Sequence, residues 1–148
     1  MTEVDRLTVV AARRYDGPAS WEVLAGPDGD GGLATVVRRW TGQGSAVGGF
    51  GGPPMRPGGL VNWWCGPIGG APDFLVVRTL PIVQRVSAFG PAGVVIGVPL
   101  GDAARFGLRF GAAPIPPGLR LVKLKVALAD GTLAEIVVPR ASAAGAAD

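Results

Sequence analysis

Short apolar segments recur along the whole chain, each alternating with polar residues and most bounded by Gly or Pro. Successive side chains of a β-strand point to opposite faces, so this period of two indicates strands, whereas helical spacing is almost absent. Asp102 also suits the start of a short helix, but Gly107 would interrupt that helix. The pattern predicts strands over Leu7–Arg14, Ser20–Ala25, Leu33–Trp40, Leu60–Cys65, Phe74–Leu80, Ile82–Phe89, Val94–Val98 and Asp102–Phe110.

The segment Leu119–Val138 holds two more alternating runs, on either side of Ala129-Asp130-Gly131, and predicts a β-hairpin. A two-residue Asp-Gly turn would place Glu135 on the apolar face, opposite Val126. A three-residue loop, with Gly131 in the left-handed conformation, shifts the pairing by one residue and keeps that face dry. We therefore predict the longer loop and the pairs Val126–Ala134, Leu124–Ile136 and Val122–Val138, with Lys125 opposite Glu135 on the wet face.

These segments predict an all-β domain, an antiparallel β-sandwich or barrel-like fold of about nine short strands with little or no helix. We expect residues 1–140 to form a single domain, because 148 residues are enough for one core. Residues 41–59 are rich in Gly, show neither period, and predict a long loop. The prolines at 114, 116 and 117 predict an extended lead into the hairpin, and residues 141–148 a flexible tail.

Composition indicates a folded chain with few charges. Gly and Pro are frequent, at 25 and 14 residues, but 48% of residues are hydrophobic and only 17% charged, the reverse of the disorder signature. The bias toward Ala, Gly, Pro and Arg is typical of a GC-rich bacterial genome. The net charge of +3 is spread along the chain without a dense basic stripe, so nucleic-acid binding is not expected.

Two absences limit the chemistry and the compartment. The chain has no histidine, which excludes Ser-His-Asp and Cys-His catalysis and most zinc sites. Its one cysteine, Cys65, cannot form an intramolecular disulfide, and its neighbours Trp64 and Gly66 provide no activating base, so we expect a buried, inert thiol. The N-terminus resembles no secretory signal and no apolar run could span a bilayer. We expect a cytoplasmic protein that binds no cofactor, no metal and no membrane.

The remaining polar motifs favour structural roles. Most carboxylates lie at predicted turns, where Asp bonds its own backbone. The glycines between residues 42 and 52 lack the adjacent lysine or following helix that a phosphate-binding loop requires. The basic pairs Arg13-Arg14 and Arg38-Arg39 could form one small patch if their strands pair, although a solvated face that protects a sheet edge is the simpler interpretation.

Aromatic residues bracket the predicted loop and define the candidate binding residues. If Leu60–Cys65 is a strand, adjacent Trp63 and Trp64 point to opposite faces and one of them lies outside the main core. Such a tryptophan could be covered by the loop, anchor a subunit interface or stack on a ligand. Arg56 could hold an anionic group with its planar fork. The candidate ligand or partner residues are Trp40, Phe50, Arg56, Asn62, Trp63 and Trp64.

Two functions follow as hypotheses. High apolarity, low charge and the missing catalytic residues favour a small non-catalytic binding or assembly module that self-associates through an apolar face or an edge strand. Its partner would be a protein or a second copy of the chain, in a homo-oligomer. The alternative is a small-ligand site, which could be enzymatic, beneath residues 41–59.

Overall fold

The computed structural model describes residues 7–13, 20–41, 44–53, 55, 58–70, 72–101, 106–139 and 144–146. In these residues the chain is almost entirely β-structure, with twelve strands and one short 3-10 turn at Pro91–Gly93. All strand pairs are antiparallel and fall into three sheets of four strands. The all-β antiparallel prediction is thus confirmed. In the described part of the chain, no helix is both long and apolar enough to cross a membrane.

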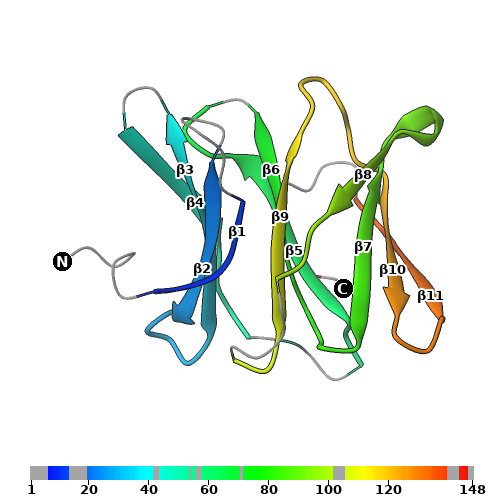
Figure 1. Ribbon diagram of the computed structural model, residues 1–148, viewed down its shortest axis with the longest axis horizontal. Coiled ribbons are helices and arrows are strands. Elements are labelled where there is room, and N and C mark those ends of the chain that lie inside the picture. Colours follow the sequence, from blue (N-terminus) through cyan, green and yellow to red (C-terminus); the bar gives the residue numbers. More distant parts are fainter. Residues whose placement is uncertain are drawn as a thin grey trace.

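The three sheets lie side by side as layers (Figure 1). The first sheet is a meander in the order β1-β2-β3-β4, formed by β1 (Thr8–Arg13), β2 (Trp21–Pro27), β3 (Leu33–Thr41) and β4 (Gly44–Phe50). The middle sheet has the order β12-β5-β6-β9, from β5 (Val61–Pro67), β6 (Asp73–Thr79), β9 (Arg109–Ile115) and β12 (Ala144–Ala146). The third sheet has the order β11-β10-β7-β8, from β7 (Val83–Phe89), β8 (Val95–Val98), β10 (Lys123–Leu128) and β11 (Leu133–Val137).

The middle sheet is buried on both faces, which explains its long apolar runs. In β6, Leu75 and Val77 pack into the cluster shared with the third sheet, whereas Phe74 and Val76 pack into the cluster shared with the first sheet. All four side chains are at most 4% exposed. A strand covered on both faces needs a continuous apolar run rather than an alternating one, and the sequence Phe-Leu-Val-Val satisfies that need.

The hairpin prediction is confirmed residue by residue. Val126 pairs with Ala134, Leu124 with Ile136 and Lys125 with Glu135. The loop contains three residues: the backbone N–H of Leu128 donates to Thr132 O at 2.9 Å, and the N–H of Gly131 donates to Leu128 O at 3.0 Å. Gly131 has a φ of +88°, the left-handed conformation that glycine adopts without strain.

The prediction of a loop over residues 41–59 is wrong for residues 44–50, which form β4 and pair with β3. Glycine permits this pairing. A Cβ atom on Gly49 would lie 2.1 Å from the carbonyl oxygen of Thr35 and 2.6 Å from Cα of Val36. The absence of a side chain at Gly49 therefore allows β4 to approach β3 closely, and hydrophobic periodicity does not predict this contact.

Near the C-terminus, two further predictions need correction. The strand expected over Asp102–Phe110 begins at Arg109 and runs to Ile115, so Pro114 lies inside β9 rather than in a lead segment. Proline is tolerated there because β9 is at the edge of its sheet. Residues 102–105 lie outside the described residues. The expected flexible tail is wrong for residues 144–146, which pair with β5 as β12.

Two strands of the first sheet differ in detail from the alternation. In β1 the register shifts between Val9 and Ala11, and the apolar side chain of Val9 is 42% exposed. At such a bulge, one strand carries an extra residue. The residues beyond it therefore point to the opposite face from the one that strict alternation would give. In β2, Trp21 and Val23 face the core, and Glu22 on the other face is also buried.

Candidate functional site

Two of the candidate binding residues, Phe50 and Asn62, lie in one cluster around Arg78, which was not among the residues predicted from the sequence. Arg78, on β6, is 1% exposed, and its guanidinium carbon lies 4.5 Å from the ring centroid of Phe50. Its Nη2 donates to the carbonyl oxygens of Pro53 at 2.7 Å and Gly52 at 3.3 Å. Asn62 Nδ2 donates to the same Pro53 oxygen at 3.3 Å. The cluster thus binds residues 52 and 53 of its own chain.

Arg78 is also bonded to β3, so it joins the middle sheet to the first. Its Nη1 donates to Thr35 Oγ1 at 3.0 Å and to the carbonyl oxygen of Leu33. Burial lowers the pKa of Arg78 to about 10, and the negative charge of Asp28 partly counteracts this effect. The buried Nε has no hydrogen-bond acceptor among the described residues. The guanidinium remains charged at neutral pH and holds carbonyl groups together.

Asp28 completes this arrangement from the β2–β3 turn. Its Oδ1 accepts the N–H groups of Asp30 and Gly32 at 2.8 and 2.9 Å, and its Oδ2 accepts the N–H of Gly52 at 3.0 Å. These backbone hydrogen bonds, that of Asp30 first, hold the pKa of Asp28 below its usual value. Gly52 is therefore bound at its N–H by Asp28 and at its carbonyl oxygen by Arg78. The prediction that turn carboxylates bond their own backbone is confirmed at Asp28 and, through the Thr132 N–H, at Asp130.

The tryptophans do not converge on this cluster. Trp63 and Trp64 point to opposite faces, as predicted, but both contact a core: Trp63 is 2% exposed among the residues facing the third sheet, and Trp64 is partly buried toward the first. Trp64 thus lies outside the larger core cluster that contains Trp63, but it packs against the second cluster because their strand belongs to the middle layer. Trp40 is 36% exposed beneath the guanidinium of Arg38. Arg56 lies outside the described residues.

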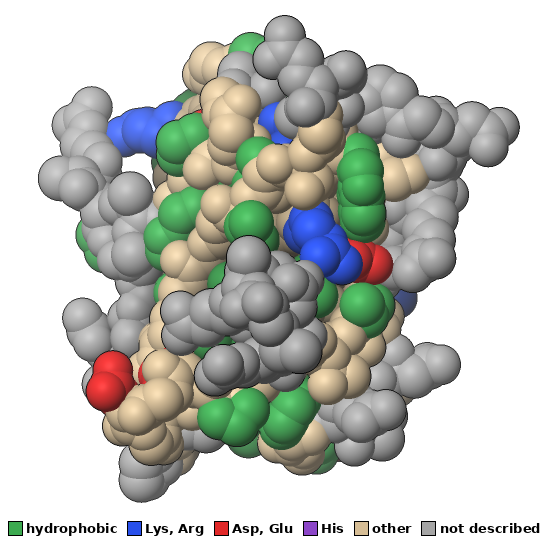
Figure 2. Space-filling view, turned by 90° about the vertical axis from the view of Figure 1, so that its left-hand side faces the viewer, with side chains coloured by type: hydrophobic (Ala, Val, Ile, Leu, Met, Phe, Trp, Pro, Cys, Tyr) green, Lys and Arg blue, Asp and Glu red, His purple; other side chains and the backbone are tan. Residues whose placement is uncertain are grey.

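Arg38 and Arg39 do not form one basic patch, because adjacent residues of β3 face opposite ways. Arg38 forms an ion pair with the buried Glu22 on the outer face of the first sheet. Figure 2 shows this side of the molecule, where a basic side chain lies against an acidic one among apolar groups. The guanidinium carbon of Arg39 lies 5.7 Å from the ring centroid of Phe74. The side chain of Arg13 and all of Arg14 lie outside the described residues.

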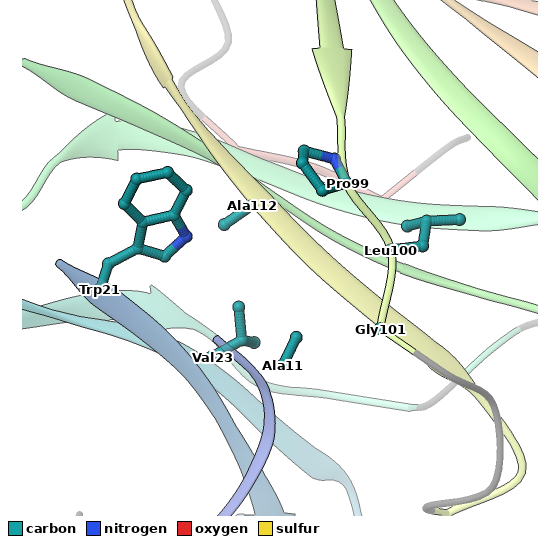
Figure 3. A pocket seen from close by; sticks show the side chains of 7 residues that line it. All are labelled: Ala11, Trp21, Val23, Pro99, Leu100, Gly101 and Ala112. Carbon is teal, nitrogen blue, oxygen red and sulfur yellow. The ribbon is translucent and has the colours of Figure 1, made fainter. Parts of the chain in front are cut away.

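Among the described residues, two of the cavities lie between the layers. The smaller, of about 80 Å³, is lined mainly by apolar groups, with Trp21, Val23 and Ala11 of the first sheet facing Pro99, Leu100 and Ala112 (Figure 3). The larger, of about 320 Å³, lies between the middle and third sheets, and its polar side chains are those of Cys65, Asp73 and Arg120. Burial, with a smaller contribution from the charge of Asp73, raises the pKa of the Cys65 thiol to about 11. A thiol with this pKa is a poor nucleophile at neutral pH.

The outer face of the third sheet combines apolar and basic side chains. Its cross-strand rows are Val137–Lys123–Phe89–Val95, then Glu135–Lys125–Ser87–Gly97, then Leu133–Ala127–Arg85. The ammonium groups of Lys123 and Lys125 lie 3.4 and 3.6 Å from Glu135 Oε1. Both also lie over the Phe89 ring, at 5.5 and 5.0 Å from its centroid. The ion pairs agree with the hairpin register, and their exposure to solvent makes their contribution to stability small.

β11 forms the edge of this sheet and pairs only with β10. Thr132 and Val138, on either side of β11, form backbone hydrogen bonds with Leu128 and Val122. Residues of an antiparallel pair alternate between bonding inward and outward, so the N–H and C=O groups of Leu133, Glu135 and Val137 point away from β10. The side chains of Leu133 and Val137 are 69% and 77% exposed. This edge therefore offers both backbone hydrogen-bonding groups and apolar surface.

Comparisons with known proteins add no relative to this description: no family model, no curated protein and no solved structure matches the chain. Within the described residues, no group of three or more Cys, Asp or Glu side chains is placed to hold a metal ion.

Proposed function

We propose that this chain is a small, non-catalytic assembly module of the cytoplasm that self-associates when β11 accepts the same strand of a second copy. The observation that supports the proposal is the open edge of β11, where outward backbone groups are flanked by exposed Leu133 and Val137. Sheet edges of this kind pair readily with another strand, and natural proteins usually block them with charged side chains, Pro or a bulge. The five residues of β11 contain no Lys, Pro or bulge, and their one charge, on Glu135, is paired with Lys123 and Lys125 of β10.

Other parts of the molecule support binding less well. The polar groups of Arg78 and Asn62 are bonded to the chain's own carbonyl oxygens, which favours a structural role over ligand binding beneath residues 51–53. The chain has no histidine, and Cys65 has a raised pKa, which favours a non-catalytic role. A five-residue edge buries less surface than the roughly 800 Å² per partner of stable complexes, so the expected dimer is weak and depends on concentration.

Sedimentation velocity over a range of protein concentrations tests the proposal with a matched pair of variants. Leu133→Lys places a charge at the β11 edge, whereas Val95→Lys makes the same change at an exposed position on the opposite edge of the same sheet. We expect wild type and Val95→Lys to dimerise with rising concentration and Leu133→Lys to remain monomeric.

A second variant guards against a general effect of added charge. The N–H of Glu135 points away from β10, so Glu135→Pro removes an outward donor and leaves the hairpin hydrogen bonds in place. We expect this variant to stay monomeric, with a β-type circular dichroism spectrum that shows it is folded. A wild-type chain that is monomeric at all concentrations, or a dimer that survives both β11 variants, would contradict the proposal.

A further inference from the structure

The sequence of β11, Leu-Ala-Glu-Ile-Val, is nearly symmetric in character about its central residue. On the outer face, Leu133 and Val137 lie at equal distances from Glu135. On the inner face, Ala134 and Ile136 do the same, and both pack partly against the core shared with the middle sheet. A twofold axis perpendicular to the sheet at Glu135 would therefore place apolar residues opposite apolar residues on both faces.

We infer that, given the self-association proposed above, two copies pair β11 antiparallel about a twofold axis at Glu135 and extend the third sheet across the interface. Leu133 then lies opposite Val137 of the other copy, and Ala134 opposite Ile136, each pair occurring twice. An isologous contact of this kind closes on itself and stops at a dimer. Only the central pair, Glu135 against Glu135, is not apolar.

The central carboxylates do not prevent this register because lysines flank them. Each Glu135 is held by Lys123 and Lys125 of its own copy, at 3.4 and 3.6 Å. The pKa of Glu135 is lowered, first by its hydrogen bond with Lys123 and by that residue's charge. The interface centre thus contains two carboxylates between four ammonium groups. Like charges directly opposite each other cost some stability, and these neighbouring opposite charges offset that cost.

Other registers fit less well. Sliding the pairing by two residues keeps outward backbone groups matched but sets Glu135 against Leu133 or Val137 of the other copy, and leaves two apolar residues of each β11 without a partner in the other strand. Sliding it by one residue opposes outward groups of one copy to inward groups of the other, which breaks the ladder. The twofold at Glu135 is the register that pairs all five residues.

Disulfide trapping tests the register in a Cys65→Ala background, which removes the native thiol. Residues of a hydrogen-bonded antiparallel pair have Cα atoms about 5.5 Å apart, a spacing that a disulfide accepts. In the inferred register, Glu135→Cys lies opposite itself. Val137→Cys is four residues from its own copy, roughly 13 Å along the strand at about 3.3 Å per residue. We expect Glu135→Cys to cross-link at least about tenfold faster than Val137→Cys, because pairing raises its effective concentration.

A mixture and a control complete the test. Leu133→Cys and Val137→Cys chains, mixed in equal amounts, should cross-link as heterodimers faster than either alone, whereas Val95→Cys reports random collision. Faster cross-linking of Val137→Cys with itself, or equal rates at all positions while Leu133→Lys still abolishes the dimer, would overturn the register and leave the proposed function standing. A monomeric wild-type chain would instead overturn the proposed function and this inference with it.

Discussion

Arg78 is the residue whose environment departs furthest from its sequence context. It follows the apolar run Phe74–Val77 in a strand buried on both faces, and its hydrogen bonds reach β3 and residues 52 and 53. A buried charge is costly unless hydrogen bonds satisfy it, and here carbonyl oxygens rather than a carboxylate provide most of them. The sequence contained one signal of this role, a single arginine within a strand-like apolar segment, FLVVRTL.

We predict that Arg78→Met destabilises the fold by roughly 2–4 kcal/mol, because the carbonyl groups of Leu33, Gly52 and Pro53 each lose a charged hydrogen-bond donor. Arg85→Met is the matched control, since Arg85 lies on the exposed face of β7 and should change stability by no more than about 0.5 kcal/mol. Urea unfolding followed by tryptophan fluorescence measures both. Equal stabilities of the two variants would refute the joining role of Arg78.

The pKa of Cys65, about 11 against an ordinary value of 9.0, predicts a native thiol that reacts slowly. Below about pH 9, the native thiolate fraction should be ~100-fold smaller than in the unfolded chain, so a maleimide should label native protein about 100-fold more slowly. Because the folded-state pKa is raised, the neutral thiol contributes stability below pH 9, and this contribution is lost as the pH rises through about 11. Labelling at the same rate in buffer and in urea would contradict the burial of the thiol.

Among the elements, β4 shows how glycine can build a strand instead of a loop. Its sequence, GSAVGGF, has too many glycines for a strand by propensity, yet all seven residues pair with β3. Close approach to β3 requires the absence of a side chain at residue 49, because a Cβ there would overlap the backbone of Thr35. Thr35 in turn accepts a hydrogen bond from Arg78, so this close contact also supports the junction between layers.

We therefore predict that Gly49→Ala destabilises the fold by about 1–3 kcal/mol, since β3 and β4 must separate to admit the methyl group. Gly97→Ala is the control: a Cβ on Gly97, in β8, meets nothing within 4 Å, and the change should be neutral or stabilising by about 0.4–1 kcal/mol. Thermal unfolding of the two variants measures the difference. If Gly49→Ala is as stable as Gly97→Ala, the close contact between β3 and β4 does not exist in solution.

At the scale of the whole molecule, the arrangement of layers determines which surfaces remain free. The edge strands β1, β4, β8 and β9 each contact a strand of a neighbouring sheet. β11 is the edge strand of the third sheet and pairs only with β10 (Figure 1). The proposed dimer would pair this edge and join two third sheets into one. Sedimentation and disulfide trapping test this dimer, because both measure how two complete molecules associate.

The sequence predicts best those features that depend on interactions between residues close together in the chain. The hairpin loop and register followed from alternation and from the conformation that Gly131 allows, both of which involve residues close in the chain. The sequence predicts the candidate site least well. Phe50 and Asn62 do lie together, but their common neighbours, Arg78 and Asp28, are distant in sequence and were not predicted.

The amino-acid sequence by itself determined that this protein is an antiparallel β fold, and it set the pairing at the hairpin, because side-chain alternation and turn chemistry act over a few residues. Only the tertiary structure decided that there are three layers, that Trp63 and Trp64 both contact a core, and that residues 44–50 form a strand. These features depend on which sheet covers which face. That choice is made by packing between distant segments, which no local pattern encodes.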